Sequence, residues 1–332
     1  MDHHAKMAEL IMGFVPAQAV AVAAELGIAD LVAREPMTAE RLAAETHANP
    51  RALFRLLRYL ASIGVFQADE QDRFGLTPMA SLLRSDSEGS MRSMARIMGR
   101  LGPRSADRLI DGVRSVRCAF EVAFGKPIFE FLSERPEEAQ LFDAAMNGFH
   151  GSETGAVLEA YDFAGISTLA DIGCGNGGVM LATLKRYPSL RGLFFDRPDV
   201  IERTGASIGA AGLAGRCELV SGSFLESVPR GPDAYFMRHI IHDWSDDPAL
   251  RILQNIRQAI PPAGRLLIVE MIVPGGNAPS LAKSFDVTMM LLPDGLERTE
   301  EEYRELLRAG GFEVSGITPT LSPVAVIEAR PV

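Results

Sequence analysis

The sequence predicts an α/β protein in which a mostly parallel β-sheet, covered by helices on both faces, follows a helical N-terminal half. Two observations support this fold class. After residue 165, short runs rich in β-branched and aromatic residues alternate with helical stretches. Before it, apolar residues recur at spacings of three and four, which is the period of an amphipathic helix.

Seven strands are expected in the C-terminal half. They are predicted at residues 168–172, 192–196, 217–220, 234–238, 265–270, 312–318 and 324–329. Helical stretches separate the first five, and parallel neighbouring strands need such crossover connections. The sequence therefore predicts a layered helix–sheet–helix arrangement.

The first 80 residues show a winged-helix pattern. Its elements are a long apolar helix over 8–31, a short helix after Thr38, a helix over 52–63, and two wing strands at 65–68 and 73–76. Gly27 is expected to interrupt or end the first helix, and Asn49-Pro50 is a typical helix start. The first helix is too apolar to leave in water, so we expect a homodimer built through residues 1–100.

Net charge and cysteine use narrow the function classes. The 33 Lys and Arg against 43 Asp and Glu leave a formal charge of −10, which disfavours nucleic acid and anionic lipid as partners. The three cysteines, Cys118, Cys174 and Cys217, lack metal-site spacing, so we expect no metal and a reducing, cytoplasmic location. The sequence has no signal-peptide pattern and no run of 18 apolar residues, so no membrane association is expected.

A winged helix can also bind DNA, and Arg51, Arg55 and Arg58 share one face of the helix that starts at Asn49-Pro50. The acidic turn between the wing strands and the negative net charge of the chain oppose DNA binding. The alternative is a dimerisation module in which these arginines pair with acidic groups or lie in solvent.

A glycine loop closes the first predicted strand. It runs from Asp171 to Gly178 as Asp-Ile-Gly-Cys-Gly-Asn-Gly-Gly and opens a helix, so a ligand can approach the backbone at the carboxyl edge of the sheet. A nucleotide site follows, although the loop alone fits a nicotinamide, a flavin or no ligand. Asp196 ends the next strand, where a carboxylate can accept both ribose hydroxyls; the alternative is a helix N-cap for the segment from Arg197.

Five ordered motifs carry a family resemblance. They are the glycine loop, FDRPDVI at 195–201, HDWSD at 242–246, LLIVEMIVP at 266–274 and ERT at 297–299. With the winged-helix front, the chain resembles plant-type and bacterial small-molecule O-methyltransferases that use S-adenosylmethionine. An acidic residue two positions before the first glycine, in a loop at mid-chain, is also typical of methyltransferases. The resemblance implies a Rossmann-like class I domain over 165–332, a helical linker contributing to the substrate pocket over 101–164, and a dimerisation domain over 1–100 that is all-α apart from the wing.

The resemblance also implies roles for single residues. His242 matches the general base, and Glu270 and Glu297 match the carboxylates that flank its imidazole. The implied cofactor-binding positions are Asp171, Gly173, Gly175, Asp196, Ser223, Phe224, Arg238 and Trp244. The implied acceptor-binding positions are Phe142, Met146, Asp243 and Met289.

Elementary chemistry supports the base, because a phenol with a pKa near ~10 is a weak nucleophile at pH 7 unless its proton is removed. One departure concerns the cofactor: Ser223 stands where relatives carry an acidic residue, which places a shorter and uncharged group at the adenine.

Three alternatives remain at this stage. The first is transfer to nitrogen or carbon, or a relative of the same fold that has lost methylation. The second is a winged-helix regulator with a nucleotide effector, and the third is a nicotinamide dehydrogenase. The intact HDWSD motif with both glutamates favours proton abstraction from a hydroxyl, on a small aromatic or polyketide-type acceptor.

Overall fold

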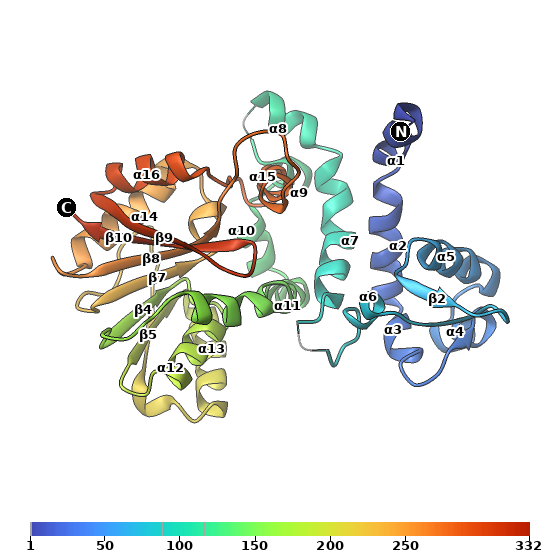
Figure 1. Cartoon of the computed structure of the whole chain (residues 1–332), viewed down its shortest axis with the longest axis horizontal. Helices are drawn as coiled ribbons and strands as arrows, with labels where there is room; N and C mark the ends of the chain where they lie inside the picture. The colour runs from blue at the N-terminus through green and yellow to red at the C-terminus, as the bar shows by residue number, and fades with distance from the viewer. Residues whose placement is uncertain (1, 88, 116) are drawn as a thin grey trace. The chain divides into compact units, whose positions relative to one another are not determined.

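The computed structural model describes residues 2–87, 89–115 and 117–332 (Figure 1). It comprises two compact units. The N-terminal unit contains the residues up to Arg104 together with Leu132–Gly151, and the C-terminal unit contains Ser105–Phe131 and Ser152–Val332. Each unit has its own hydrophobic core.

The C-terminal unit is built on a seven-stranded sheet with the order β6-β5-β4-β7-β8-β10-β9. Its strands are β4 Thr168–Ile172, β5 Arg191–Asp196, β6 Cys217–Ser221, β7 Ala234–Arg238, β8 Arg265–Met271, β9 Phe312–Pro319 and β10 Val324–Pro331. Neighbours from β6 to β8 are parallel, and β10 is antiparallel to both β8 and β9. All seven predicted strands are confirmed, and so is the Rossmann-like fold class.

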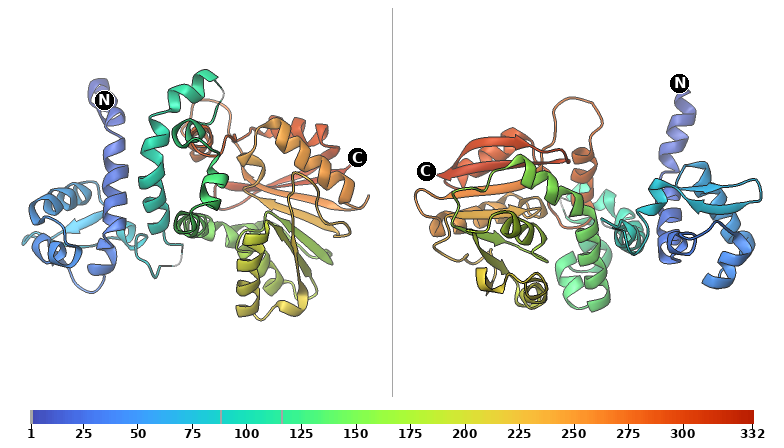
Figure 2. Two further views of the ribbon diagram at one scale, coloured as in Figure 1. Left: turned by 180° about the vertical axis from the view of Figure 1, so that it is seen from behind. Right: turned by 60° about the horizontal axis from the view of Figure 1, so that its bottom comes forward.

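Helices cover both faces of this sheet. They are α12 Gly178–Arg186, α13 Pro198–Ala210, α14 Asp246–Ala259 and α16 Glu300–Ala309. Alternate strand residues such as Ala170 and Met237 join one core with Ile252 of α14 and Leu307 of α16. The residues between them face the other way, where Phe194 lies against Gly177 at the start of α12. Figure 2 shows the twisted strands and these helices from two further directions.

Shorter elements complete the C-terminal unit. They are α8 Leu109–Ser115, α9 Ala119–Phe124, α15 Leu281–Leu291 and the 3₁₀ turns η1 Ala214–Arg216 and η2 Ile241–Asp243. Helix α15 packs against α8 and α9, and the Cys118 thiol donates to the Leu292 carbonyl oxygen over 2.9 Å. Helices α10 Ile128–Ser133 and α11 Pro136–Ala160 each contribute residues to both units.

The N-terminal unit contains the expected helices after Thr38 and after Asn49, the two expected strands and one strand that was not predicted. Its elements are α1 His3–Ile11, α2 Phe14–Glu25, α3 Ile28–Leu31, β1 Met37–Thr38, α4 Ala39–Thr46, α5 Pro50–Ser62, β2 Phe66–Ala68, β3 Arg73–Leu76, α6 Pro78–Ser81 and α7 Arg92–Ala106. Thr38 and Asn49 accept hydrogen bonds from Arg41 N and Ala52 N, so both predicted helix starts are confirmed. Strand β1 pairs with β3, which gives an antiparallel sheet of order β1-β3-β2.

The predicted helix over 8–31 is wrong as one element, because it breaks at Gly13 as well as near Gly27. Pro16 explains the first break, since proline has no N–H and its ring clashes with the carbonyl four residues earlier. The axes of α1 and α2 are bent by 42° relative to each other. Within the described residues no single helix is long and apolar enough to span a membrane, and only this bent pair reaches that length and apolar composition. Met7, Leu10, Ile11 and Phe14 are exposed on them.

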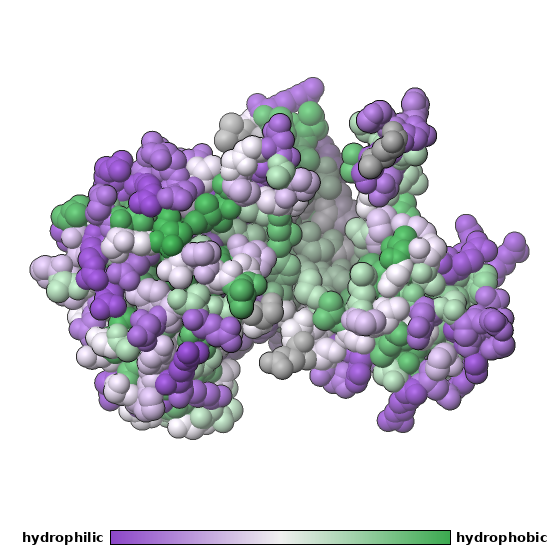
Figure 3. Space-filling model, viewed as in Figure 1, coloured by the Kyte–Doolittle hydropathy of each residue, from purple (hydrophilic) through white to green (hydrophobic). Residues whose placement is uncertain are grey.

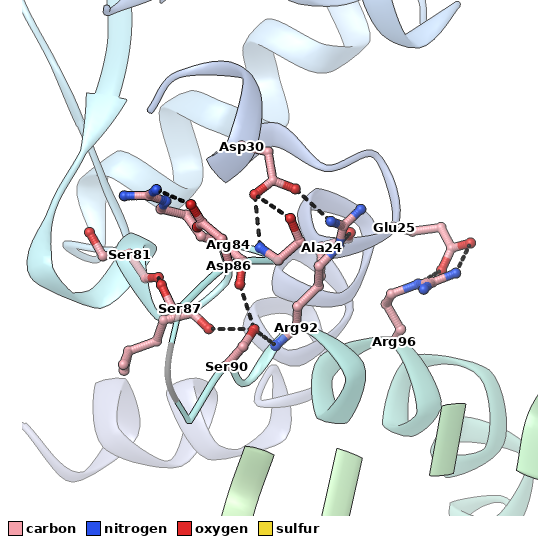
Figure 4. A network of polar contacts seen from close by, with 12 residues as sticks. Ala24, Glu25, Asp30, Ser81, Arg84, Asp86, Ser87, Ser90, Arg92 and Arg96 are labelled. Atoms are coloured by element: carbon pink, nitrogen blue, oxygen red, sulfur yellow. Dashed lines mark hydrogen bonds and ion pairs between the residues drawn. The ribbon is translucent and has the colours of Figure 1, made fainter. Parts of the chain in front are cut away.

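Polar side chains tie α7 to α2 and α3 within the N-terminal unit (Figure 4). Arg92 donates to Asp30 and to the Ala24 carbonyl oxygen. Arg96 and Arg100 both donate to the carboxylate of Glu25. Elsewhere on this unit, hydrophilic side chains cover the outer surface around α4, α5 and the wing (Figure 3).

Candidate active site

The glycine loop after β4 needs glycine for two reasons. Gly173, Gly175 and Gly177 have φ of 74°, 52° and 74°, in the left-handed region. A Cβ on Gly173 would lie 2.4 Å from Ile240 Cδ1, and one on Gly177 would lie 2.7 Å from Phe194 Cε1. The loop therefore brings bare backbone to the carboxyl edge of the sheet, the place where open α/β sheets bind ligands.

Asp196 at the end of β5 fastens this loop. Its Oδ2 accepts from Gly175 N over 3.0 Å, and its Oδ1 accepts from Arg197 N over 2.8 Å. Helix α13 begins at Pro198 after Arg197 and has no side-chain cap, so Asp196 does not act as the N-cap that the sequence left as an alternative. Burial raises the pKa of Asp196, and the two backbone N–H groups oppose that rise.

Other predicted cofactor positions lie around the loop. Burial raises the pKa of Asp171 to about 7, although the charge of Arg238 favours its ionised form. A Cβ on Gly173 would also lie 3.6 Å from Phe224 Cε1, so the Phe224 ring lies next to the loop. The rings of Phe224 and Trp244 meet edge to face with centroids 5.9 Å apart. These residues gather at one edge of the sheet, and their contact with a cofactor stays a prediction.

Ser223 and Arg238 also lie at this edge. The Ser223 carbonyl oxygen accepts from Glu226 N and Ser227 N in the turn after β6. Arg238 ends β7, and its Nη1 donates to Thr154 Oγ1 over 3.3 Å.

His242 lies in η2, directly after β7, and is 6% exposed. Its Nδ1 lies 2.8 Å from Glu297 Oε1 and 3.6 Å from Glu270 Oε2. On the other side of the ring, Nε2 lies 3.5 Å from Asp243 Oδ1. The three carboxylates and the imidazole form one buried cluster, in which Glu270 and Glu297 lie beside the imidazole as the family resemblance implies.

The two glutamates hold His242 in different ways. Glu297 pairs with the ring itself, which favours the tautomer with the proton on Nδ1. Glu270 Oε1 accepts instead from the backbone N–H groups of residues 240, 241 and 242, over 3.1, 2.9 and 3.4 Å. Glu270 thus fixes the turn, and its Oε2 makes no hydrogen bond within the described residues.

The cluster favours added protons. Burial by itself lowers the pKa of His242, but Glu270, Asp243 and Glu297 outweigh it and raise that pKa to about 10. Burial raises the pKa of Glu270 to about 7 and that of Asp243 to about 6, with His242 opposing both shifts. Perturbed titration of this kind is concentrated at functional sites.

Two further residues hold the turn, and the sequence motifs did not single them out. Arg298 is 1% exposed and donates to the carbonyl oxygens of Ile241 and Trp244 over 3.2 and 3.0 Å. A Cβ on Gly295 would lie 1.8 Å from the His242 carbonyl oxygen, so only glycine fits there. The position of Arg298 directly after Glu297 in the ERT motif was the available signal for the first of them.

The predicted acceptor positions divide between the units. Asp243 and Met289 belong to the C-terminal unit, where Met289 is buried on α15. Phe142 and Met146 lie on α11 within the N-terminal unit. Their joint contribution to one acceptor pocket stays a prediction, as does the absence of a metal.

Comparison with known proteins identifies the family. The O-methyltransferase domain model matches residues 107–313, and the O-methyltransferase dimerisation domain model matches residues 8–86. A phenazine O-methyltransferase of Lysobacter antibioticus is 40% identical over 98% of this chain and 95% of its own length. An 8-amino-8-demethylriboflavin N,N-dimethyltransferase of Streptomyces davaonensis is 36% identical over 92% of this chain and 89% of its own length.

A solved structure agrees with both domain matches. A methyltransferase of calicheamicin biosynthesis, in its form with bound S-adenosylhomocysteine (SAH), superposes with a TM-score of 0.88 at 32% identity over the whole of both chains. The glycine loop, the buried imidazole and these matches agree, and the chain belongs to the O-methyltransferase family, whose catalytic and dimerisation domains it carries.

Proposed function

We propose that this enzyme transfers a methyl group from S-adenosylmethionine to a hydroxyl of a small aromatic or polyketide-type acceptor, with His242 as general base. The observation that carries the proposal is the buried imidazole. Glu297 holds its Nδ1, while Nε2 lies on the opposite side of the ring, 3.5 Å from Asp243 Oδ1, at the limit of hydrogen-bond range.

The residues of the cluster divide the chemistry among them. Bound S-adenosylmethionine supplies an electrophilic methyl group on a sulfonium. His242 Nε2 would take the hydroxyl proton as the acceptor oxygen bonds to the methyl carbon and the carbon–sulfur bond breaks to leave a neutral thioether, and Glu297 and Glu270 would stabilise the resulting imidazolium. Asp243, next to Nε2, contacts the acceptor. The positive charge of the bound sulfonium would oppose the effect of the carboxylates and lower the raised pKa of His242. The neutral imidazole would then be available as a base.

The cofactor site follows from the loop and its surroundings. Asp196 accepts from the ribose hydroxyls, the backbone at Gly173 and Gly175 faces the amino-acid part, and Phe224 and Trp244 pack on the adenine. Asp171, Ser223 and Arg238 complete the site, with the neutral Ser223 weakening the contact to the adenine amino group. A thermal-shift comparison tests this: S-adenosylmethionine raises the melting temperature and NADH does not.

The acceptor class rests on the family and on the phenazine O-methyltransferase among its relatives. Phe142, Met146 and Met289 are the proposed apolar lining, since thioethers adapt to flat aromatic rings. Incubation with phenols, quinones and aromatic acids should give a product heavier by one CH₂, detected by mass spectrometry. A product methylated on nitrogen or carbon would contradict the proposal.

Transfer to nitrogen is the second candidate, favoured by the N,N-dimethyltransferase at 36% identity. The nitrogen lone pair of a neutral amine is nucleophilic before the amine loses a proton, whereas the oxygen of a neutral phenol is only a weak nucleophile. Replacing His242 therefore separates the candidates: hydroxyl transfer falls sharply, and amine transfer falls little.

The proposed assembly is a cytoplasmic homodimer built through residues 1–100, without nucleic-acid or membrane partners. The dimerisation-domain match and the exposed apolar residues of α1 and α2 support it. A chain that sediments as a monomer at micromolar concentration would contradict it.

A further inference from the structure

A second buried imidazole lies beside the proposed base. His239 follows β7 and is 8% exposed, and its ring centroid lies 5.0 Å from that of His242. Its backbone has φ of 53°, a conformation that residues other than glycine rarely adopt. The backbone N–H of His239 donates to the Val269 carbonyl oxygen over 3.1 Å, which continues the pairing of β7 with β8 and fixes the residue in place.

Both nitrogens of the His239 ring lie near carboxylates. Nε2 lies 2.8 Å from Glu153 Oε2, which comes from the last turns of α11 in the same unit. Nδ1 lies 3.7 Å from Glu270 Oε2. Because the same Glu270 oxygen lies 3.6 Å from His242 Nδ1, one buried carboxylate oxygen is shared between two imidazoles.

The two carboxylates beside the His239 ring favour a proton on it. Glu153 is 2% exposed and Glu270 is fully buried, and buried carboxylates are stable as anions only beside a cation or hydrogen-bond donors. Glu153 also interacts with Arg238 on β7. An imidazolium at His239 would lie between the two glutamates and satisfy both.

We propose that His239 is a positioning residue for the methyl transfer, acting through the shared oxygen of Glu270: a proton held on His239 offsets the negative charge that Glu270 presents to His242, and so opposes protonation of His242. The titratable and charged groups that bear on its charge are His150 and Glu153 from α11, Glu270 from β8, His242 from η2 and Arg238 from β7. The inference rests on the proposed function, because it treats His242 as the base. It assigns His239 the task of keeping that base neutral at lower pH.

The test is the pH profile of kcat in His239→Asn. Asparagine tolerates a positive φ, so this variant removes the imidazole and keeps the backbone. Without a positive neighbour, His242 holds its proton more firmly. The acid limb of kcat should move to higher pH by about one pH unit, which lowers kcat about tenfold on the limb and leaves the alkaline plateau unchanged. Glu153→Gln should move the limb in the same direction by less.

The matched control is His47→Asn, because His47 ends α4 with φ of 55° and lies in the N-terminal unit. It should leave the profile unchanged. An unmoved limb in His239→Asn, or an equal loss of kcat at every pH, overturns the proposal, since a packing role predicts either. If His239→Asn does not fold, an unmoved limb in folded Glu153→Gln overturns it. Failure of the proposed function has a different signature, which is a His242→Ala enzyme that keeps the wild-type rate and limb.

Discussion

Two glutamates, Glu25 in the N-terminal unit and Glu270 in the C-terminal unit, have pKa values moved in opposite directions. Hydrogen bonds from Arg96 and Arg100 lower the pKa of Glu25 to about 2 on a half-exposed surface. Burial raises the pKa of Glu270 to about 7, in a cluster where imidazoles stand in place of arginines. The first carboxylate is a fixed anion, and the second is poised to exchange a proton.

The difference separates a charge cluster that holds elements together from one that performs chemistry. Guanidinium groups do not give up their protons, so the pairs of α7 with α2 and α3 keep one charge state over the physiological range. In the cluster around His242, burial brings the pKa of Glu270 to about 7 and that of Asp243 to about 6, so this cluster can exchange a proton near neutral pH. Substitutions in the two clusters should therefore differ in kind: loss of rate and altered pH dependence in one, a small loss of stability in the other.

The largest effect is expected for His242→Ala, which removes the proton acceptor. We expect kcat to fall by about two to four powers of ten while cofactor affinity stays nearly intact. In wild type, kcat/KM should rise with pH through a pKa above the ordinary 6.5, because the carboxylates stabilise the imidazolium. In the variant, the rate should follow ionisation of the acceptor itself. Steady-state kinetics across pH measures both, and unchanged turnover would remove His242 from the mechanism.

Asp196→Ala should weaken cofactor binding about ten- to a hundredfold, since a charged hydrogen bond is worth about 1.5–3 kcal/mol. It also releases Gly175 N from the loop. Asp196→Asn is the control, because its amide oxygen can still accept from Gly175 N. Calorimetry with S-adenosylmethionine gives both affinities, and equal affinity in all three proteins would mean that Asp196 does not contact the cofactor.

Glu297→Gln should lower kcat about tenfold, the lower end for residues that orient a reactive group. The amide oxygen can still accept from His242 Nδ1, but the lost charge lowers the pKa of His242, so the acid limb of kcat should move to lower pH. Glu270→Gln should move it the same way. His239→Asn is expected to move it upward, so one set of pH profiles distinguishes anions from the proposed cation.

Gly295→Ala tests the close packing that holds the turn, since its Cβ would lie 1.8 Å from the His242 carbonyl oxygen. We expect about 1–3 kcal/mol lower unfolding free energy together with reduced kcat. Gly275→Ala is the matched control, because nothing lies within 4 Å of its Cβ. Chemical denaturation and kinetics measure both. Equal stability of the two variants would show that residues near 295 can move away from the base without cost.

The smallest effect is expected in the N-terminal unit. Glu25→Gln removes an ion pair with two arginines that is 45% exposed on the glutamate side, so it should cost only about 0.2–1 kcal/mol at neutral pH. Since the pKa of Glu25 is lowered in the folded state, its contribution is complete above about 4.5 and is lost as pH falls through about 2. Denaturation at neutral and acidic pH checks this. A much larger loss would mean that the two clusters do not differ as described.

Local patterns explain how much could be predicted from sequence. Short runs rich in β-branched and aromatic residues, alternating with helical stretches, indicated all seven strands, and cap residues such as Thr38 and Asn49 marked helix starts. The family resemblance implied that Glu270 and Glu297 flank His242, and the structure brings the three side chains together. The helix break at Gly13 was missed although its cause, Pro16, is local, since proline is also compatible with the first turn of a helix.

The sequence by itself thus determined which segments form strands and helices along the chain, the position of the glycine loop and the residue types of the site. Only the tertiary structure decided which glutamate holds the imidazole and which holds the turn, because that depends on backbone N–H groups converging on Glu270 Oε1. It alone paired His239 with Glu153, which lies 86 residues away on α11. The tertiary structure alone separates the pKa values of Glu25 and Glu270. Burial and neighbouring charges, not residue type, decide the free energy of protonating each carboxylate.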